Sequence, residues 1–577
     1  MMLLVLSLWV ALATAATLSE LCTHEHVIAS LGENPLTEIG ISTIVDSITV
    51  NVVAEYSLPS GPGSSGNPAK YDLCNVTFAY THPSTSTKVN VWYWLPDPAI
   101  FRNRYLSTGG GGYAITSGER SLSTGLPYGA VTGTTDGGLG SWRAQLTDRI
   151  LKANGVIDYD ILFLFAYEAI HGMTVLGQQL TKNFYATDKL FSYYTGCSEG
   201  GREGLSQVQR YGSQFDGAVV GAPAIRFSQL QVLHLYTPLL EIKRGYVPSA
   251  CEVARIVDHV IEKCDALDGR KDGVVSRTDL CMVNYNVTSA VGLEYSCEAL
   301  TGPGFPGGAP SAAVPAAKGT VSPEAANIVQ DIWSGMLDSE GRHIYVSFPP
   351  TAVPSYAQGS YDATSRTYKP TLSSLGVLWV NYFLDEIKSS ELSLNDATYD
   401  TLRDWVLEGI QKYADTLQTN WPNLEEFRDS GGKLIHYHGE SDNGIPASSS
   451  VLYYEAVRKT MYPQQSFNES VTQMDDWYRF YLVPGAGHCG PSSTQLNGPF
   501  PDDALASLIS WVEDEVVPER LNATVRAGSV QDKDQKLCSW PLRPYWTGNG
   551  TTMNCEYHQE SINSWMPLLD SIPVEIV

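Results

Sequence analysis

The sequence predicts an α/β fold, with a mostly parallel sheet, flanking helices and a large insertion. Short apolar segments typical of buried strands alternate with helical segments. One strand runs into a helix through the pattern Gly196-x-Ser198-x-Gly200. A loop acid, Asp442, and a histidine, His488, follow later. This order of serine, acid and histidine is that of α/β-hydrolase folds, so we expect that fold, with a large insertion between the serine and the acid.

The N-terminal part predicts antiparallel strands. Residues 41–56 and 74–95 alternate apolar and polar side chains, and the second stretch is closed by Pro96. Further on, short apolar segments predict core strands that alternate with helices. These strands are expected at residues 104–108, 128–133 and 216–223, with a helix at 171–182.

The Gly-x-Ser-x-Gly pattern predicts a nucleophile elbow, a sharp turn that lifts the Ser198 hydroxyl out of the sheet. Residues 190–194 form the aromatic strand before it, and residues 203–210 can form the helix after it. The flanking glycines leave room for the strained backbone. The alternative is a glycine-rich turn that carries an ordinary surface serine.

A run of four glycines, residues 109–112, follows the strand at 104–108. In folds of this type, one oxyanion-hole amide comes from such a loop and the other from the residue after the nucleophile. We therefore assign the donors to the amide of Glu199 and to that of Gly110 or Gly111. A flexible turn is the alternative for the glycines.

Cysteines flank both the serine and the histidine. If Cys197 and Cys489 form a disulfide, their Cα atoms must lie within about 7 Å, which brings Ser198 and His488 together. Asp442 follows an apolar strand that contains two further histidines at positions 436 and 438. We expect these histidines in a packed or hydrogen-bonded wall rather than in a metal site. Glu440 is a rival for the role of the triad acid.

The motifs Cys-Ser, Asp and His-Cys resemble those of the tannase and feruloyl esterase family of secreted fungal enzymes. Residues 196–204 and 436–442 are most similar to the fungal tannases, and the likeness extends from about Cys22 to Cys555. The resemblance implies a Ser198–Asp442–His488 triad. It also implies, together with spacing, four further disulfides: Cys22–Cys74, Cys264–Cys281, Cys538–Cys555 and, by remainder, Cys251–Cys297.

Between the elbow and the acid the sequence loses its strand–helix alternation. We expect a catalytic domain in two parts, residues 16–227 and 428–577, with a lid domain at 228–427 between them. Helices are expected at residues 323–337 and 399–413. A Gly/Pro-rich stretch, residues 301–319, predicts a surface loop or a flexible linker. Some fungal tannases are cut into two chains near this point at a basic pair, which this segment lacks, so we do not expect such cleavage here.

Three aspartates, Asp265, Asp268 and Asp272, lie close together in the expected lid. Their spacing alone favours an exposed acidic turn, partly neutralised by Arg270 and Lys271. The family resemblance instead implies a structural calcium site, because calcium takes carboxylate and carbonyl oxygens from loops. Its ligands would be the three aspartate side chains and the carbonyls of Arg270 and Val274. No organic cofactor is expected.

Several features of the chain are typical of an exported protein. Residues 1–15 predict a signal peptide, since an apolar run is followed by Ala-Thr-Ala. Ten cysteines then favour disulfides. The net charge of −25 argues against a nucleic-acid partner, and no later apolar run of about 20 residues predicts a membrane span. Sequons predict glycans at Asn75, Asn286, Asn468, Asn522 and Asn549.

These patterns together predict a secreted serine esterase. The resemblance implies aromatic acid esters as small-molecule substrates, first galloyl esters of tannins and second feruloyl or other cinnamoyl esters. A catalytically inactive binding module of the same fold is a different class, and it would be expected to lack a triad member. A peptidase shares the triad chemistry and is disfavoured only by the resemblance. The sequence leaves the oligomeric state open.

Overall fold

The computed structural model describes residues 16–32, 43–44, 48–58, 69–81, 85–299, 315–352 and 359–571. The expected signal peptide and most of the Gly/Pro-rich stretch at 301–319 lie outside these ranges.

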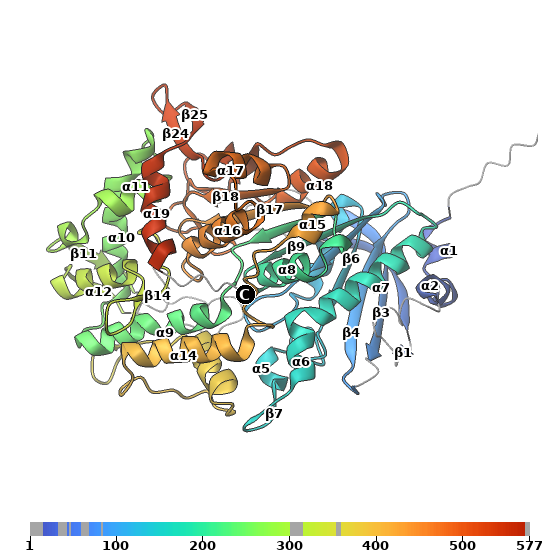
Figure 1. Cartoon of the computed structure of the whole chain (residues 1–577), viewed down its shortest axis with the longest axis horizontal. Helices are drawn as coiled ribbons and strands as arrows, with labels where there is room; N and C mark the ends of the chain where they lie inside the picture. The colour runs from blue at the N-terminus through green and yellow to red at the C-terminus, as the bar shows by residue number, and fades with distance from the viewer. Residues whose placement is uncertain are drawn as a thin grey trace, which may run out of the picture.

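A ten-stranded mixed sheet forms the centre of the catalytic part (Figure 1). Its order is β1-β3-β4-β6-β5-β9-β10-β17-β18, with β2 paired to β3. Six neighbouring strands of this order, β6, β5, β9, β10, β17 and β18, are parallel to one another. The strands β1 to β4 extend one edge of the sheet in antiparallel pairings. This arrangement confirms the predicted α/β fold. The strands are β1 (Thr43–Ile44), β2 (Thr49–Ser57), β3 (Lys70–Thr81), β4 (Val89–Pro96), β5 (Arg104–Thr108), β6 (Ala130–Thr135), β9 (Phe191–Cys197), β10 (Gly217–Gly221), β17 (Lys433–Gly439) and β18 (Tyr478–Val483).

Both faces of the parallel strands are covered, so most of their residues are buried and burial does not alternate along them. Neighbouring residues enter two different clusters, as successive side chains on a strand must. Tyr194 packs with α7 and α8, for example, whereas Tyr193 packs with α18. Tyr105 and Leu106 divide in the same way.

Helices cover the sheet and connect its strands. α7 packs on β4, β5 and β6, α8 on β9 and β10, and α18 on β10 and β17. The helices of the catalytic part are α1 (Leu18–Leu21), α2 (His24–Leu31), α4 (Glu119–Ser123), α5 (Leu146–Arg149), α6 (Tyr159–Phe163), α7 (Ala169–Phe184), α8 (Glu199–Arg210), α16 (Ala447–Met461), α17 (Phe467–Asp475), α18 (Ala504–Asp514) and α19 (Gln559–Ser571). Short helical turns lie at η1 (Leu126–Tyr128), η2 (Leu164–Glu168) and η3 (Gly212–Gln214), and a hairpin at β7 (Leu151–Ala153) and β8 (Val156–Ile157).

One helical run departs from the sequence expectation. Residues Tyr159–Phe184 form a run of 26 residues that is long and apolar enough to cross a membrane by length and composition. Within this run, 67% of the most apolar 18-residue segment is buried inside the protein. Its apolar side chains pack into the main core against β4, β5 and β6. The run is therefore apolar because its side chains form part of the hydrophobic core.

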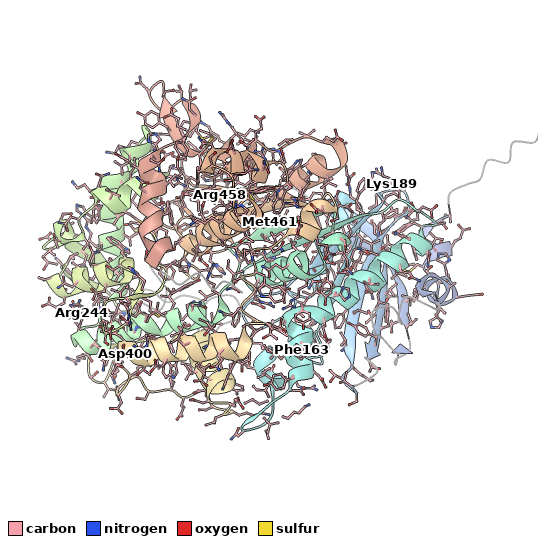
Figure 2. The ribbon with its side chains drawn as sticks, viewed as in Figure 1. Phe163, Lys189, Arg244, Asp400, Arg458 and Met461 are labelled. Atoms are coloured by element: carbon pink, nitrogen blue, oxygen red, sulfur yellow. A yellow bond between two sulfur atoms is a disulfide. The ribbon has the colours of Figure 1, made fainter. Side chains whose placement is uncertain are left out.

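Between β10 and β17 the described chain contributes no strand to the central sheet. This insertion begins with α9 (Phe227–Arg244), against which α14 (Tyr399–Tyr413) packs. Figure 2 shows Arg244, the last residue of α9, and Asp400, in the first turn of α14, at the same end of this pair. Its other elements are α10 (Ala250–Cys264), η4 (Asp265–Asp268), α11 (Thr278–Asn284), η5 (Val287–Ala290), β11 (Glu294–Cys297), β12 (Ala317–Thr320), α12 (Pro323–Trp333), β13 (Met336–Leu337), β14 (His343–Tyr345), β15 (Ser360–Asp362), β16 (Thr367–Lys369), α13 (Ser374–Leu378), η7 (Trp379–Leu384) and α15 (Glu425–Asp429). The division into domains at residues 227 and 427 stays a prediction.

The C-terminal part connects the insertion to the sheet. Its last helix, α19, packs on α11 of the insertion and on α16 of the catalytic part (Figure 1). Small strands precede it: β19 (Ala486–Gly487), β20 (Gly490–Pro491), β21 (Pro499–Phe500), β22 (Arg520–Val525), β23 (Asp534–Cys538), β24 (Arg543–Thr547) and β25 (Thr552–Glu556).

All ten cysteines lie in the described residues and are paired. One pair, Cys197–Cys489, was expected from its position beside Ser198 and His488. The other four are those that the resemblance and spacing implied: Cys22–Cys74, Cys251–Cys297, Cys264–Cys281 and Cys538–Cys555. Only Cys197–Cys489 joins segments that are far apart in the sequence, with a separation of 292 residues.

Candidate active site

Ser198 occupies the sharp turn between β9 and α8. Its backbone has φ 64° and ψ −124°, a conformation that costs a non-glycine residue about 1–3 kcal/mol. The neighbouring glycines permit this turn by close packing. A Cβ at Gly196 would lie 2.4 Å from the Gly200 carbonyl oxygen, and one at Gly200 would lie 2.9 Å from the Gly110 carbonyl oxygen. The segment therefore has the geometry of the predicted elbow.

The structure brings Ser198, His488 and Asp442 together. His488 Nε2 lies 2.9 Å from Ser198 Oγ, and His488 Nδ1 lies 2.9 Å from Asp442 Oδ2. The three residues follow β9, β18 and β17, whose carboxyl ends meet at one edge of the sheet because these strands are parallel. One imidazole thus bridges a hydroxyl and a carboxylate, which is the arrangement needed for nucleophilic catalysis.

The charges in this cluster stabilise one another. Burial raises the pKa of Asp442, but the charge of His488 and the hydrogen bonds from His438 and His488 outweigh burial and hold that pKa far below its usual range. Burial lowers the pKa of His488, whereas the Asp442 carboxylate raises it more, so its net shift is upward from 6.5. The pair therefore favours an ionised acid and a basic imidazole.

The Cys197–Cys489 disulfide links the residues that adjoin Ser198 and His488. The two Cα atoms are 6.0 Å apart, and both cysteines are half-buried. His488 itself lies in the tight hairpin between β19 and β20. The bond therefore limits how far the histidine hairpin can move from the elbow.

Glu440, the rival acid, points into a different environment. Its Oε1 accepts hydrogen bonds from Arg543 Nη2 and Thr278 Oγ1, and the side chain is fully buried. Arg543 also faces Asp279 of the insertion, which pairs with Arg277. Glu440 is thus a structural partner of two other segments, and Asp442 is the acid that contacts His488.

The amides expected to donate to the oxyanion differ in whether they already have an acceptor within the protein. The Glu199 amide lies in the first turn of α8, where N–H groups have no acceptor within the helix. The Gly110 amide donates to Glu203 Oε2 at 2.8 Å, and the Gly111 amide donates to the Ala114 carbonyl at 2.9 Å. Each glycine amide therefore already has a partner inside the protein.

A buried ionic cluster lies directly behind the elbow. Arg202 pairs with Glu199 at 2.6 Å, while Glu203 faces the same cluster, and all three side chains are at most 1% exposed. Burial raises the pKa of Glu203 well above its usual range, and the charge of Glu199 adds to this shift. Sequence reasoning did not assign Glu203 a role, although it follows Ser198 by five residues, close to one and a half helical turns.

Two histidines that the sequence did not indicate as site residues contact the loop that carries Asp442. His438 Nε2, on β17, lies 3.2 Å from Asp442 Oδ2. His234 Nε2, on α9 of the insertion, lies 3.0 Å from the Gly444 carbonyl oxygen. Burial lowers the pKa of His234 to about 4, so this ring is neutral. The signal for His438 was its position four residues before Asp442, whereas nothing in the sequence pointed to His234.

The five residues implied as calcium ligands lie in one loop of the insertion. Both Asp265 oxygens accept from backbone amides, those of Asp272 and Gly273, and Asp272 pairs with Arg270 at 3.0 Å. Asp268 Oδ2 is buried and has no hydrogen-bond partner in the described part of the chain. Burial, together with the charges of Asp272 and Asp265, raises the pKa of Asp268 to about 6.

In the described part of the chain, this aspartate loop does not form a ready-made metal site. Among the described residues, no group of three or more His, Cys, Asp or Glu side chains is arranged to hold an ion. The amide of Val274 donates to Asp272 Oδ1, so the loop closes on itself through hydrogen bonds.

Of the five predicted glycosylation sites, four are exposed: Asn286, Asn468, Asn522 and Asn549. Asn75 differs, because its carboxamide donates to Asn51 and accepts from the Trp94 indole and is only half-exposed. The attachment of glycans stays a prediction.

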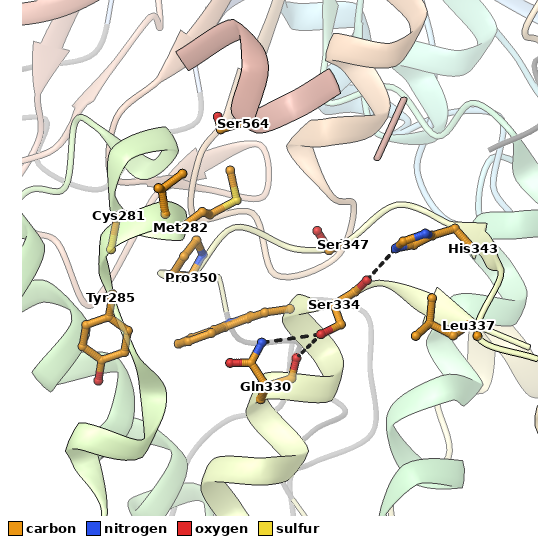
Figure 3. A pocket seen from close by; sticks show the side chains of 13 residues that line it. Cys281, Met282, Tyr285, Gln330, Ser334, Leu337, His343, Ser347, Pro350 and Ser564 are labelled. Atoms are coloured by element: carbon orange, nitrogen blue, oxygen red, sulfur yellow. Dashed lines mark hydrogen bonds between the residues drawn. The ribbon is translucent and has the colours of Figure 1, made fainter. Parts of the chain in front are cut away.

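A separate cavity of about 400 Å³ lies between α11, α12, β13 and α19 (Figure 3). None of Ser198, Asp442 and His488 lines it. Its polar groups largely bond to one another: Gln330 Nε2 donates to Ser334 Oγ, and His343 Nε2 lies 2.9 Å from the Ser334 carbonyl oxygen. The cavity is thus distinct from the Ser198 site.

Comparisons with known proteins find similarity over nearly the whole chain. Residues 74–560 match the family described as "Tannase and feruloyl esterase". The chain is 42% identical to a tannase of Aspergillus oryzae over 572 residues, 96% of this chain and 95% of that protein. The solved tannin acyl hydrolase from Aspergillus niger is 45% identical with a TM-score of 0.92, and the match covers 98% of this chain and 100% of that one. Feruloyl esterase B from Aspergillus oryzae is 25% identical with a TM-score of 0.67, over 88% and 96% respectively.

Mild reduction should impair catalysis more than folding. Only Cys197–Cys489 has both cysteines half-buried, whereas each of the other four disulfides has at least one buried cysteine. A reductant should therefore reach this bond first. We expect ester hydrolysis to fall while the far-ultraviolet circular dichroism stays constant. Parallel loss of the two signals would contradict the prediction, and mass spectrometry after thiol alkylation identifies the opened pair.

The Asp442→Asn substitution should move the acid limb of the pH profile. His488 must be neutral to accept a proton, so reaction of Ser198 rises with pH through the His488 pKa, which lies above 6.5. Without the Asp442 charge, burial is the main remaining influence and lowers that pKa. We expect the midpoint to move to lower pH, measured as the rate of Ser198 labelling by a fluorophosphonate. An unchanged midpoint would show that Asp442 does not act on His488.

Proposed function

The chain belongs to the tannase and feruloyl esterase family and is a carboxylic ester hydrolase, and we propose that it hydrolyses galloyl esters of tannins through Ser198, His488 and Asp442. The observation that carries the catalytic assignment is the position of the His488 ring, 2.9 Å from both Ser198 Oγ and Asp442 Oδ2. An intact set of these three groups argues against an inactive binding module.

In the proposed reaction, His488 Nε2 takes the proton from Ser198 Oγ as this oxygen attacks the ester carbonyl. Asp442 accepts the hydrogen bond from His488 Nδ1 and stabilises the imidazolium. The protonated imidazole then protonates the leaving alcohol as the ester C–O bond breaks, giving an acyl-serine. Water, deprotonated by His488, attacks this acyl group and releases the acid, with Ser198 regaining its proton.

We propose the Glu199 amide as one donor to the tetrahedral oxyanion. Its position after the nucleophile, in the first turn of α8, supports this role. A second donor from the glycine loop would require Gly110 or Gly111 to exchange its present acceptor, Glu203 or the Ala114 carbonyl.

The proposed preference for galloyl over feruloyl esters rests on the higher sequence identity and TM-score against the tannin acyl hydrolase. Identity is 45% and the TM-score 0.92 against the tannin acyl hydrolase, compared with 25% and 0.67 against the feruloyl esterase. The second structure nevertheless covers 88% of this chain. Feruloyl ester hydrolysis is therefore the second candidate.

We also propose that the loop of Asp265, Asp268 and Asp272, with the carbonyls of Arg270 and Val274, holds a structural calcium ion. The buried Asp268 oxygen without a partner supports this, as does the presence of three carboxylates beside one guanidinium. Calcium would supply positive charge to oxygens that burial has separated from water. Binding would require Asp272 to release Arg270.

The five disulfides are typical of an oxidising compartment. On this basis we propose that the protein is secreted and carries N-linked glycans at the exposed sequons. Within this proposal its partner is a small aromatic ester.

Hydrolysis of methyl gallate and methyl ferulate should distinguish the two substrate classes. We expect the purified protein to release gallate at the higher kcat/KM and the Ser198→Ala variant to release neither acid. Loss of the nucleophile should lower kcat by about 10⁶-fold, the size seen for such triads. Higher kcat/KM on ferulate would keep the mechanism and reverse the substrate assignment. Activity retained by Ser198→Ala would overturn the mechanism.

Removal of calcium should lower thermal stability. A ligand present at a hundredfold excess over its Kd stabilises the folded state by about 2.7 kcal/mol. We expect EDTA to lower the unfolding temperature and added Ca²⁺ to restore it. The matched control is Asp268→Asn, which should already have the lower value and respond to neither reagent. A wild-type unfolding temperature that is insensitive to EDTA would contradict the site.

A further inference from the structure

We propose that His438 is a positioning residue, which holds the Asp442 carboxylate in the orientation that His488 requires. This role rests on the proposed triad, because His438 touches neither Ser198 nor the reacting ester but acts through Asp442. The structure supplies a complete set of contacts for it.

Asp442 is a fully buried carboxylate whose two oxygens each face two donors. Oδ1 accepts from the amides of Gly444 and Ile445 at 2.8 and 2.9 Å. Oδ2 lies 2.9 Å from His488 Nδ1 and 3.2 Å from His438 Nε2. The carboxylate plane is thus held at both ends. Removal of His438 would leave Oδ2 with the His488 hydrogen bond alone to fix it.

The direction of the His438 hydrogen bond follows from its neighbours. His438 Nε2 faces Asp442 Oδ2 and also the Ile445 carbonyl oxygen at 2.9 Å. Both groups only accept hydrogen bonds, so Nε2 carries the hydrogen whether the ring is neutral or charged. In either state His438 presents this N–H to two acceptors, the Ile445 carbonyl at 2.9 Å and the Asp442 carboxylate at 3.2 Å.

The other ring nitrogen of His438 begins a chain of hydrogen bonds through three further groups. His438 Nδ1 lies 2.7 Å from Ser450 Oγ, which lies 2.8 Å from His436 Nε2. His436 Nδ1 in turn lies 2.8 Å from the Tyr478 hydroxyl. In the neutral ring, Ser450 donates to His438, His436 donates to Ser450, and Tyr478 donates to His436, so every hydrogen bond has one donor and one acceptor.

These contacts transfer the rigidity of the sheet to a loop. His436 and His438 belong to β17 and are fully buried. Ser450 belongs to α16, and Tyr478 belongs to β18. Asp442 follows the end of β17. A catalytic group on a loop is held accurately only when its partners are fixed by packing. His438 is the member of this wall that reaches the carboxylate, and a displacement of about 1 Å in such a group can cost about a hundredfold in rate.

The test compares His438→Gln with His438→Asn. The glutamine amide can replace the Nε2 donor toward Asp442, whereas the asparagine amide is too short and replaces only the Nδ1 end toward Ser450. Activity is measured on 4-nitrophenyl acetate, together with the rate of Ser198 labelling by a fluorophosphonate, so neither readout depends on the preferred acyl group. Circular dichroism and the unfolding temperature establish that each variant is folded. The matched control is His259→Gln, which removes another buried histidine whose Nδ1 lies 2.8 Å from the Tyr285 hydroxyl.

We expect His438→Asn to lower kcat by about ten- to a hundredfold with little change in KM, because the loss lies in orientation rather than in substrate binding. His438→Gln should recover most of this loss, and His259→Gln should stay within about twofold of the wild type. When Asp442→Asn is also present, His438→Asn should cause no further fall, since its effect passes through that carboxylate.

Wild-type kcat in a folded His438→Asn variant would overturn the positioning role, and so would an additive loss in the Asp442→Asn background. If His438→Asn does not fold, His438→Phe, which keeps a ring of similar size but has no donor, takes its place in both comparisons. A wild-type labelling rate in Asp442→Asn itself would instead overturn the triad, and with it the role of His438. Failure of the inference is therefore distinguishable from failure of the proposed function.

Discussion

The burial of one carboxylate is the constraint around which the site is built. An ionised group removed from water must have its oxygens satisfied by donors, and Asp442 receives them from its own loop, from β17 and from the hairpin after β18. By fixing the Asp442 carboxylate, these donors also fix His488, because His488 Nδ1 bonds to Asp442 Oδ2. The Cys197–Cys489 bond then limits the distance between that imidazole and the elbow. Burial, hydrogen bonding and the disulfide thus favour the same geometry.

The insertion is joined to the catalytic part by polar contacts that lie beside the acid loop. Glu440, two residues before Asp442, bonds with Thr278 of α11 and with Arg543 of the C-terminal part. His234 of α9 contacts the Gly444 carbonyl two residues after Asp442. Loss of one member of a buried ionic group generally costs about 3–5 kcal/mol, because the other charge remains buried. The loop that carries the acid is therefore held from the side of the insertion as well as from the sheet.

Local patterns predicted several elements with their ends. The strand expected at residues 104–108 is β5, and the helix expected at 399–413 is α14 with the same ends. The sequence predicted only a helix at residues 171–182, whereas the structure has one helical run, Tyr159–Phe184, that includes the π-helical turn η2. The oxyanion glycines were recognised as a loop, but their amide partners were not. Glu203 lies 93 residues from Gly110, and no local pattern encodes that contact.

The sequence by itself determined the fold class, the family and the three groups of the proposed triad, because the elbow, the acid loop and the His-Cys pair are each local motifs with fixed order. It also carried the expected cysteine pairs through the family resemblance. Only the tertiary structure decided that Asp442 rather than Glu440 faces His488, that Gly110 already donates to Glu203, and that His438 reaches the acid. Each of these outcomes depends on which side chain points into a shared space. The first two contacts join residues 46 and 93 positions apart, and the third depends on how the chain turns back after β17, so the order of residues along one strand or loop does not specify them.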